Sequence, residues 1–107
     1  MTENDVPKLL LTLRQQMSRL FGDDLYAVLL FGSRARGEAG PESDVDILVV
    51  MRSDFDYDDL LVRTSPLVAA LSLQYDTVIS RAFVSREQFE RERTPFMLNV
   101  RREAVPV

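Results

Sequence analysis

The stretch LYAVLLFGSRARGEAGPESDVDILVVM, residues 25–51, contains two apolar runs separated by a loop. Residues 25–31 carry no charge, and the run is short and bounded by turn-forming residues, which favours a strand buried on both faces over a helix. Residues 47–51 have the same character. The loop between them holds three of the four glycines of the chain and has room for one helical turn near residues 34–36. The stretch therefore predicts two core strands joined by a glycine-rich loop.

Length and composition limit the classes of protein to consider. The chain has 107 residues and is 46% hydrophobic, which suits one small domain, residues 1–107, with one core. It contains no cysteine and no histidine. This composition excludes disulfides, thiolate chemistry, zinc sites built from Cys and His, and Ser–His or Cys–His nucleophiles. Any bound metal must be held by oxygen atoms.

The net charge of −4 argues against non-specific nucleic-acid binding as the main activity, because such binding depends on neutralising phosphates with Lys and Arg. We expect no direct binding to DNA. The sequence also lacks an apolar run of about 18 residues and a basic segment followed by an apolar one at its N-terminus. We therefore expect a cytoplasmic protein without a membrane segment.

Periodicity predicts three further elements around the two strands. An amphipathic helix begins near Pro7 and ends near Gly22. After the second strand, Pro66 interrupts a helical pattern, so we expect either two pieces, residues 57–64 and 66–71, or one kinked helix. Residues 74–80 are β-branched and alternating, which predicts a third strand.

Capping signals predict two short helices at the C-terminal end. A Ser and a Gln at capping-box spacing open one helix at Ser85, and Thr94-Pro95 opens another that ends near Glu103. The resulting order is helix, strand, strand, helix, strand, helix, helix. This order predicts an α/β fold in which helices pack on a small mixed β-sheet.

Asp44 and Asp46 are the first candidates for chemistry. They lie two residues apart at the start of a strand, so both side chains leave the same face within a few Å of each other. Two carboxylates that close repel unless a cation lies between them. Mg²⁺ suits such a pair, because it prefers carboxylate oxygens and is usually completed by water and substrate phosphates.

Gly32 and Ser33, at the end of the neighbouring strand, suit the phosphates. Glycine lets the backbone approach a phosphate closely, and the serine hydroxyl can donate to a phosphate oxygen. Arg34 and Arg36 add charge-assisted donors nearby, with plain solvation as the alternative for both. The combination predicts phosphoryl or nucleotidyl transfer.

Asp76 is the third candidate acid, because it interrupts a predicted strand whose other residues belong in a core. If that strand lies beside the one carrying Asp44 and Asp46, the three carboxylates can bind two metal ions and deprotonate an attacking hydroxyl. The alternative is an exposed edge position or a helix cap.

Three competing motifs do not fit the residues. A P-loop fails because Glu38 stands where its lysine must be, and a calcium loop fails because Asp59 replaces the required glycine. A glycosidase pair needs carboxylates about 5 Å or more apart across a cleft, which alternate positions of one strand do not naturally supply.

Gly32-Ser33, ten intervening residues, Asp44-x-Asp46 and a later Asp76 together resemble the polymerase β type nucleotidyltransferase superfamily. The nearest branch is the minimal nucleotidyltransferases, and the similarity covers most of the chain. The resemblance implies that Asp44 and Asp46 bind Mg²⁺, that Asp76 completes the triad, and that Gly32 and Ser33 hold a nucleoside triphosphate.

The resemblance also implies a partner. Many relatives of this size are antitoxins paired with helical HEPN ribonuclease toxins, and some transfer AMP from ATP to a toxin tyrosine. A type VII-like antitoxin that modifies its toxin in this way is the leading hypothesis. One alternative is an antitoxin that neutralises its toxin by binding alone. Another is a nucleotidyltransferase acting on a small molecule such as an aminoglycoside.

Overall fold

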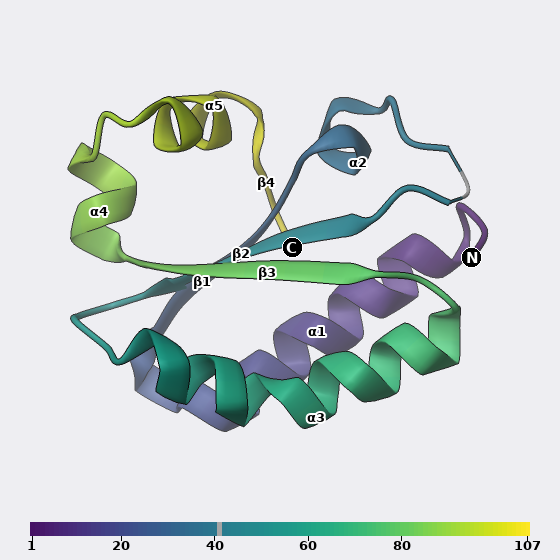
Figure 1. The fold of residues 1–107 in the computed structure, drawn as a ribbon, viewed down its shortest axis with the longest axis horizontal. Coiled ribbons are helices and arrows are strands. Elements are labelled where there is room, and N and C mark those ends of the chain that lie inside the picture. Colours follow the sequence, from purple (N-terminus) through teal and green to yellow (C-terminus); the bar gives the residue numbers. More distant parts are fainter. Residues whose placement is uncertain (41) are drawn as a thin grey trace.

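A computed structural model of the chain describes residues 1–40 and 42–107 and contains a four-stranded mixed sheet with the order β3-β2-β1-β4 (Figure 1). Strand β1 (Leu25–Phe31) pairs antiparallel with β2 (Val45–Met51). Strand β3 (Ile79–Ser85) pairs parallel with β2, and the short β4 (Val105–Pro106) pairs antiparallel with β1. The predicted α/β fold with a small mixed sheet is confirmed.

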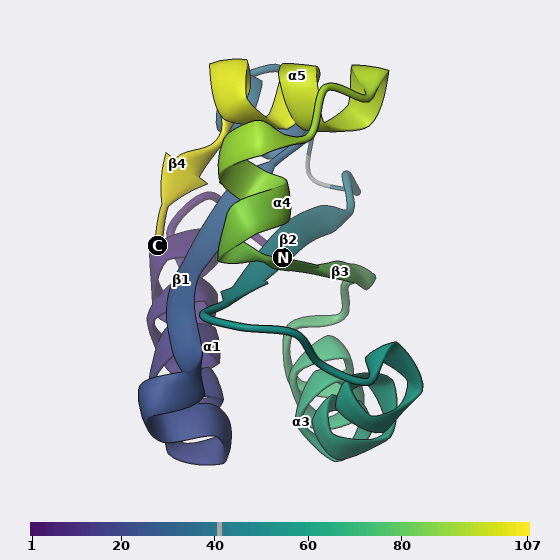
Figure 2. The same ribbon diagram turned by 90° about the vertical axis from the view of Figure 1, so that its left-hand side faces the viewer.

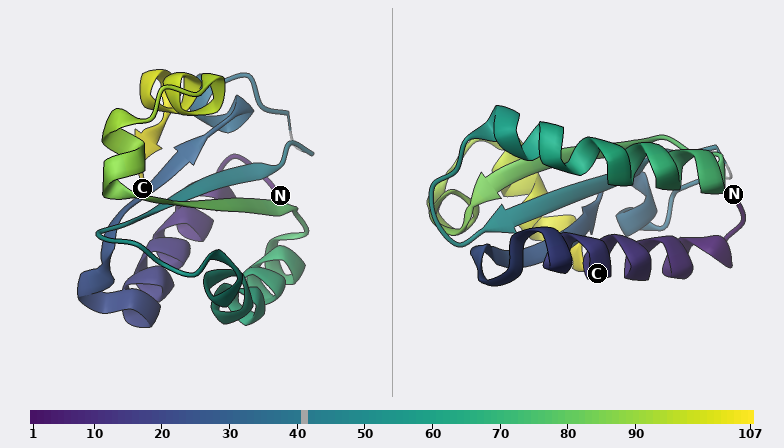
Figure 3. Two further views of the ribbon diagram at one scale, coloured as in Figure 1. Left: turned by 60° about the vertical axis from the view of Figure 1, so that its left-hand side comes forward. Right: turned by 90° about the horizontal axis from the view of Figure 1, so that it is seen from below.

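Two long helices cover one face of the sheet. Helix α1 (Asp5–Phe21) is followed by a 3₁₀ turn, η1 (Gly22–Asp24), and it packs beside α3 (Tyr57–Tyr75), as the view from below shows (Figure 3). Their buried side chains form the main core with every second residue of β2, which are Val45, Ile47, Val49 and Met51. This alternation fixes which way the remaining residues of β2 face.

The other face of the sheet carries α4 (Arg86–Arg91) and α5 (Pro95–Glu103), which lie above it in Figure 2. Met97 and Val100 of α5 pack there against Leu48 and Val50 of β2. Because side chains alternate along a strand, Asp46 shares this face with Leu48 and Val50. The first candidate carboxylates therefore face the side of the sheet that α5 covers.

Helix α3 is continuous through Pro66, so of the two alternatives left by the sequence the single helix is correct. Hydroxyl and guanidinium groups bind the backbone around the proline. Thr64 donates to the Leu60 carbonyl at 2.8 Å, and Arg81 of β3 donates to the Leu61 carbonyl at 3.1 Å. A proline lacks the amide that continues the ladder, and such side-chain bonds satisfy neighbouring carbonyls.

A third strand follows α3 as predicted, but its predicted bounds, residues 74–80, are wrong. Tyr75 ends α3, Asp76 is its C-cap in the left-handed conformation with φ 50°, and β3 begins only at Ile79. Tyr75 follows the buried Leu71 by one helical turn and packs against the same core. Helical packing thus outweighs the local strand propensity of these residues. Strand β4, two residues long, was not predicted.

Within the described residues, no helix is both long enough and apolar enough to cross a membrane.

Candidate active site

The candidate site forms where the end of β1 meets the start of β2. Phe31, the last residue of β1, pairs with Asp46, and Gly32 follows at once with φ +75°. A Cβ added to Gly32 would collide with a carboxylate oxygen of Asp46 and would lie 3.1 Å from its Cγ. Only glycine fits both this backbone conformation and this approach. The chain therefore brings the Gly32-Ser33 turn directly against a carboxylate.

The two carboxylates are electrostatically coupled. Asp44 is exposed just before β2, whereas Asp46 is half-buried within it. Burial and the nearby Asp44 carboxylate raise the pKa of Asp46 above its usual range, and the positive charge of Arg36 partly offsets this rise. The ionised pair is thus held at an electrostatic cost that a cation between the two groups would remove. Two carboxylates that repel each other in this way suit a hard divalent ion such as Mg²⁺.

Helix α2 (Ser33–Arg36) is one turn long and follows Gly32 directly, as the sequence predicted for this loop. The amides of Ala35 and Arg36 donate to the Gly32 carbonyl at 3.1 and 3.2 Å, which fixes the turn. Ser33 is the half-buried first residue of this helix. It therefore lies beside the close contact between Gly32 and Asp46.

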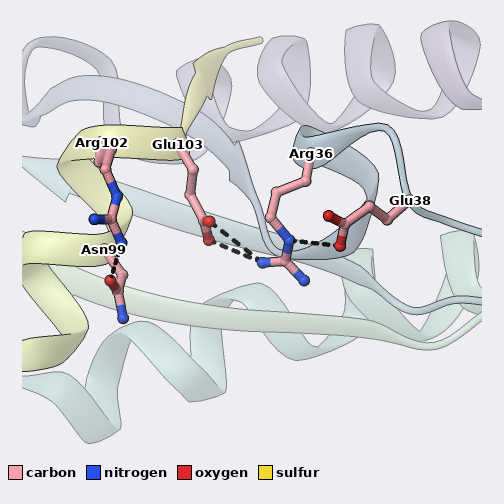
Figure 4. Close-up of polar contacts among 5 residues, drawn as sticks. All are labelled: Arg36, Glu38, Asn99, Arg102 and Glu103. Carbon is pink, nitrogen blue, oxygen red and sulfur yellow. Dashed lines mark hydrogen bonds and ion pairs between the residues drawn. The ribbon is translucent and has the colours of Figure 1, made fainter.

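The two arginines of α2 do different things. Arg34 donates through Nε and Nη2 to the Ser43 carbonyl at 3.1 and 2.8 Å, so its guanidinium closes the loop that leads into Asp44. Arg36 instead pairs with Glu38 and Glu103 (Figure 4). Its charge acts on Asp46. Of the two arginines predicted to contact phosphate, Arg36 is the one whose charge acts on Asp46, while Arg34 supports the loop.

Asp76 is not brought to this site. It is exposed at the C-terminal end of α3. Across residues 1–40 and 42–107, no three Asp, Glu, His or Cys side chains come close enough together to share a metal ion. The residue of β3 that pairs with Asp46 is Ser80. The structure therefore brings Asp46 to the Gly32-Ser33 turn with Asp44 just before it, and the residue paired with Asp46 on β3 is a serine.

Residues 10–103 match the family model of the nucleotidyltransferase domain. The chain belongs to this nucleotidyltransferase family. "Putative protein adenylyltransferase MJ0604" of Methanocaldococcus jannaschii is 42% identical to it over 65 residues, a match that covers 61% of this chain and 59% of that protein. This chain thus spans less than two thirds of that relative's length.

Two of the solved structures that are similar to this chain illustrate its fold. One is a toxin–antitoxin crystal structure with AMP-PNP, which has a TM-score of 0.57 at 22% identity and covers 99% of this chain and 72% of its own. The other is a crystal structure of "a putative nucleotidyltransferase from Sulfolobus solfataricus", with a TM-score of 0.60 at 19% identity and coverages of 92% and 78%. At these identities the likeness concerns the fold.

Sequence reasoning missed one residue of the site, Glu103. It comes from the end of α5 and meets Arg36 across a sequence separation of 67 residues. A single acid beside two arginines near a helix end has no local pattern that would single it out. Only the packing of α5 and β4 on the sheet brings it to α2.

A cavity of about 660 Å³ lies elsewhere in this nucleotidyltransferase, where β3 meets α4. Asp54, Tyr57, Phe83 and Glu87 are among its lining residues. Asp44 and Asp46 precede or begin β2, whereas Ser85 of this cavity ends β3, which runs parallel to β2. The cavity and the candidate site are therefore at opposite ends of the sheet.

Proposed function

We propose that this chain transfers AMP from ATP to a hydroxyl of a partner protein, most simply a tyrosine of a HEPN toxin, and so acts as an antitoxin. The observation that carries the proposal is the close approach of Gly32 to the Asp46 carboxylate, with the exposed Asp44 two residues before it. The relative named as a protein adenylyltransferase supports protein as the acceptor class. The shared fold with a toxin–antitoxin structure containing AMP-PNP supports the nucleotide and the kind of partner.

In this proposal each residue of the site has a defined task. Asp44 and Asp46 hold Mg²⁺, which when bound neutralises phosphate charge and orients the triphosphate. The backbone at Gly32 and the hydroxyl of Ser33 hold phosphate oxygens, and Arg36 supplies a fixed positive charge. Arg34 maintains the loop before Asp44 through its bonds to the Ser43 carbonyl.

The reaction is an in-line displacement at phosphorus. The acceptor hydroxyl oxygen forms a bond to the α-phosphorus, the bond from that phosphorus to the bridging oxygen breaks, and pyrophosphate leaves. The hydroxyl proton passes to a carboxylate or to water. Because the structure brings two acids together, we propose that the chain itself holds one cation, and that any second one arrives with the triphosphate.

The test is transfer of label from α-labelled ATP to the purified partner in the presence of Mg²⁺. We expect labelling by the wild-type chain and a loss of about 100-fold or more for Asp44→Asn and for Asp46→Asn. Asp54→Asn removes an exposed carboxylate at the opposite end of the sheet and serves as the control. Absence of label with the wild-type chain would refute the proposal.

A second function, neutralisation of the toxin by binding alone, is favoured by one observation. Asp76 lies apart from the carboxylate pair, and Ser80 stands opposite Asp46. A chain with an incomplete set of acids could still cover the toxin surface. Neutralisation in cells that persists with Asp46→Asn would support this second function over the first.

A further inference from the structure

Glu103 connects two distant parts of the chain at the candidate site. Nη1 of Arg36 in α2 lies 3.2 and 3.3 Å from the two carboxylate oxygens of Glu103, at the end of α5 (Figure 4). Nε of the same arginine donates to Glu38 at 3.0 Å. Two carboxylates therefore bind the guanidinium of Arg36, one at Nε and the other at Nη1.

Glu103 is the more buried of the two carboxylates. Its side chain is 20% exposed, compared with 65% for Glu38. The backbone on its C-terminal side is fixed, because Val105 pairs with Leu30 of β1 and the Val107 amide donates to the Val28 carbonyl at 3.0 Å. Helix α5 therefore holds Glu103 from one side and the sheet holds it from the other.

The same packing brings α5 close to the strand residues of the candidate site. Phe96 of α5 meets the ring of Phe31 edge-on at 5.6 Å, and Phe31 pairs with Asp46 on the sheet. Arg36 belongs to the same single helical turn, α2, as Ser33, directly after Gly32. Within the described part of the chain, no hydrogen-bond partner occupies Nη2 of Arg36, whereas Nε and Nη1 are both used. This edge of the guanidinium is available to an anionic ligand.

We infer that Glu103 is a positioning residue that acts through Arg36, holding the guanidinium so that its Nη2 edge receives the triphosphate of the nucleotide. This inference rests on the proposed nucleotidyl transfer. A long, unrestrained arginine loses rotamer freedom when it binds a ligand, and a carboxylate that fixes it beforehand lowers that cost. The opposite effect, competition between Glu103 and phosphate for the arginine, would make nucleotide binding tighter when Glu103 is removed.

The experiment is a binding titration with a fluorescent ATP analogue and Mg²⁺. We expect Glu103→Ala to raise Kd about 5–10-fold, and Glu103→Gln, which keeps an acceptor oxygen, to raise it no more than about 3-fold. Arg36→Ala should weaken binding at least as much as Glu103→Ala. Because Glu103 acts through Arg36, the double variant should match Arg36→Ala within about 2-fold.

Glu90→Ala is the matched control, because Glu90 forms a comparable pair with Arg86 at 2.9 Å on α4, away from the candidate site. It should leave Kd unchanged. The melting temperature of Glu103→Ala should remain within about 4 °C of the wild type, since partly exposed ion pairs contribute little stability.

Each contrary result has a distinct meaning. Unchanged or tighter binding by Glu103→Ala overturns the inference, as does an equal loss when the change is made in the Arg36→Ala background. A wild-type chain that binds no nucleotide overturns this inference and the proposed function together. A chain that binds nucleotide but labels no partner overturns the proposed transfer alone, and the role of Glu103 is then decided by the binding data.

Discussion

The β1–β2 hairpin and the α3–β3 connection both lead to the sheet, but only the hairpin delivers acids to the candidate site. In the hairpin, antiparallel pairing places Phe31 opposite Asp46, so the turn after one strand necessarily meets the start of the next. In the connection, Asp76 falls at the end of α3, before β3 begins at Ile79. The position at which α3 ends therefore decides whether Asp76 belongs to the sheet.

Gly32 and Asp76 both have a positive φ, but for different reasons. Gly32 has φ +75° because the chain must pass against Asp46, and Asp76 has φ 50° because a helix ends there. The first serves the close approach of two functional groups, whereas the second terminates secondary structure. We therefore expect Gly32→Ala to lower the stability of the fold and Asp76→Gly to raise it.

The largest effect is expected for Gly32→Ala. The added Cβ collides with the Asp46 carboxylate and forces an unfavourable φ, so we expect a loss of about 2–4 kcal/mol in the free energy of unfolding and a loss of Mg²⁺-dependent nucleotide binding. Denaturant unfolding and the binding titration measure the two effects.

Gly37→Ala is the control for the Gly32 substitution, because Gly37 has φ +74° with no atom within 4 Å of an added Cβ. Gly37→Ala should therefore lower the free energy of unfolding only through its unfavourable φ, by about 1–2 kcal/mol. Equal destabilisation by the two alanines, with nucleotide binding kept in both, would show that the approach to Asp46 is unimportant.

Much of the hairpin was predictable because its signals are local. Charge-free runs of strand length, glycines in the loop and alternate aspartates all lie within residues 25–51, and the structure has the two strands and the single turn of helix there. The roles of Arg34 and Arg36 were not separable by sequence, since both are loop arginines. What separates them is the Ser43 carbonyl on one side and Glu103 on the other.

The connection was less predictable because two local signals compete. Residues 74–80 alternate like a strand, but Tyr75 also continues the buried stripe of α3, and burial against the core decides the outcome. Glu103 and β4 depend entirely on long-range contacts. Strand β4 is two residues long and contains a proline, so its pairing with β1 has no signal of its own.

A smaller effect is expected from Asp46→Asn on the stability of the protein in EDTA. The pKa of Asp46 is raised in the folded state by burial and by Asp44, so the folded state holds this proton at pH values where the unfolded state has lost it. The contribution of Asp46 is therefore fully present below about pH 4 and declines as the pH rises through the raised pKa.

The D46N variant should accordingly be more stable than the wild type at neutral pH, by at most about 1 kcal/mol because the group is only partly buried, and the difference should vanish below about pH 4. Thermal unfolding across pH measures this. Added Mg²⁺ should stabilise the wild type and not the variant. A D46N variant less stable than the wild type at neutral pH would contradict the repulsion inferred between Asp44 and Asp46.

The smallest effect is expected for Asp76→Gly, and it tests the other half of the comparison. Asp76 caps α3 at φ 50°, a conformation that glycine adopts without strain, so the variant should gain about 0.5–1 kcal/mol of stability. Because Asp76 lies apart from the carboxylate pair, transfer of AMP should stay within about 2-fold of the wild type. Asp76→Asn, which tolerates the same φ, should change neither stability nor transfer much.

Unfolding curves and the labelling assay provide the two readouts. Loss of transfer in both variants, with the fold intact, would mean that Asp76 reaches the site during the reaction and that the connection, like the hairpin, supplies an acid to the chemistry.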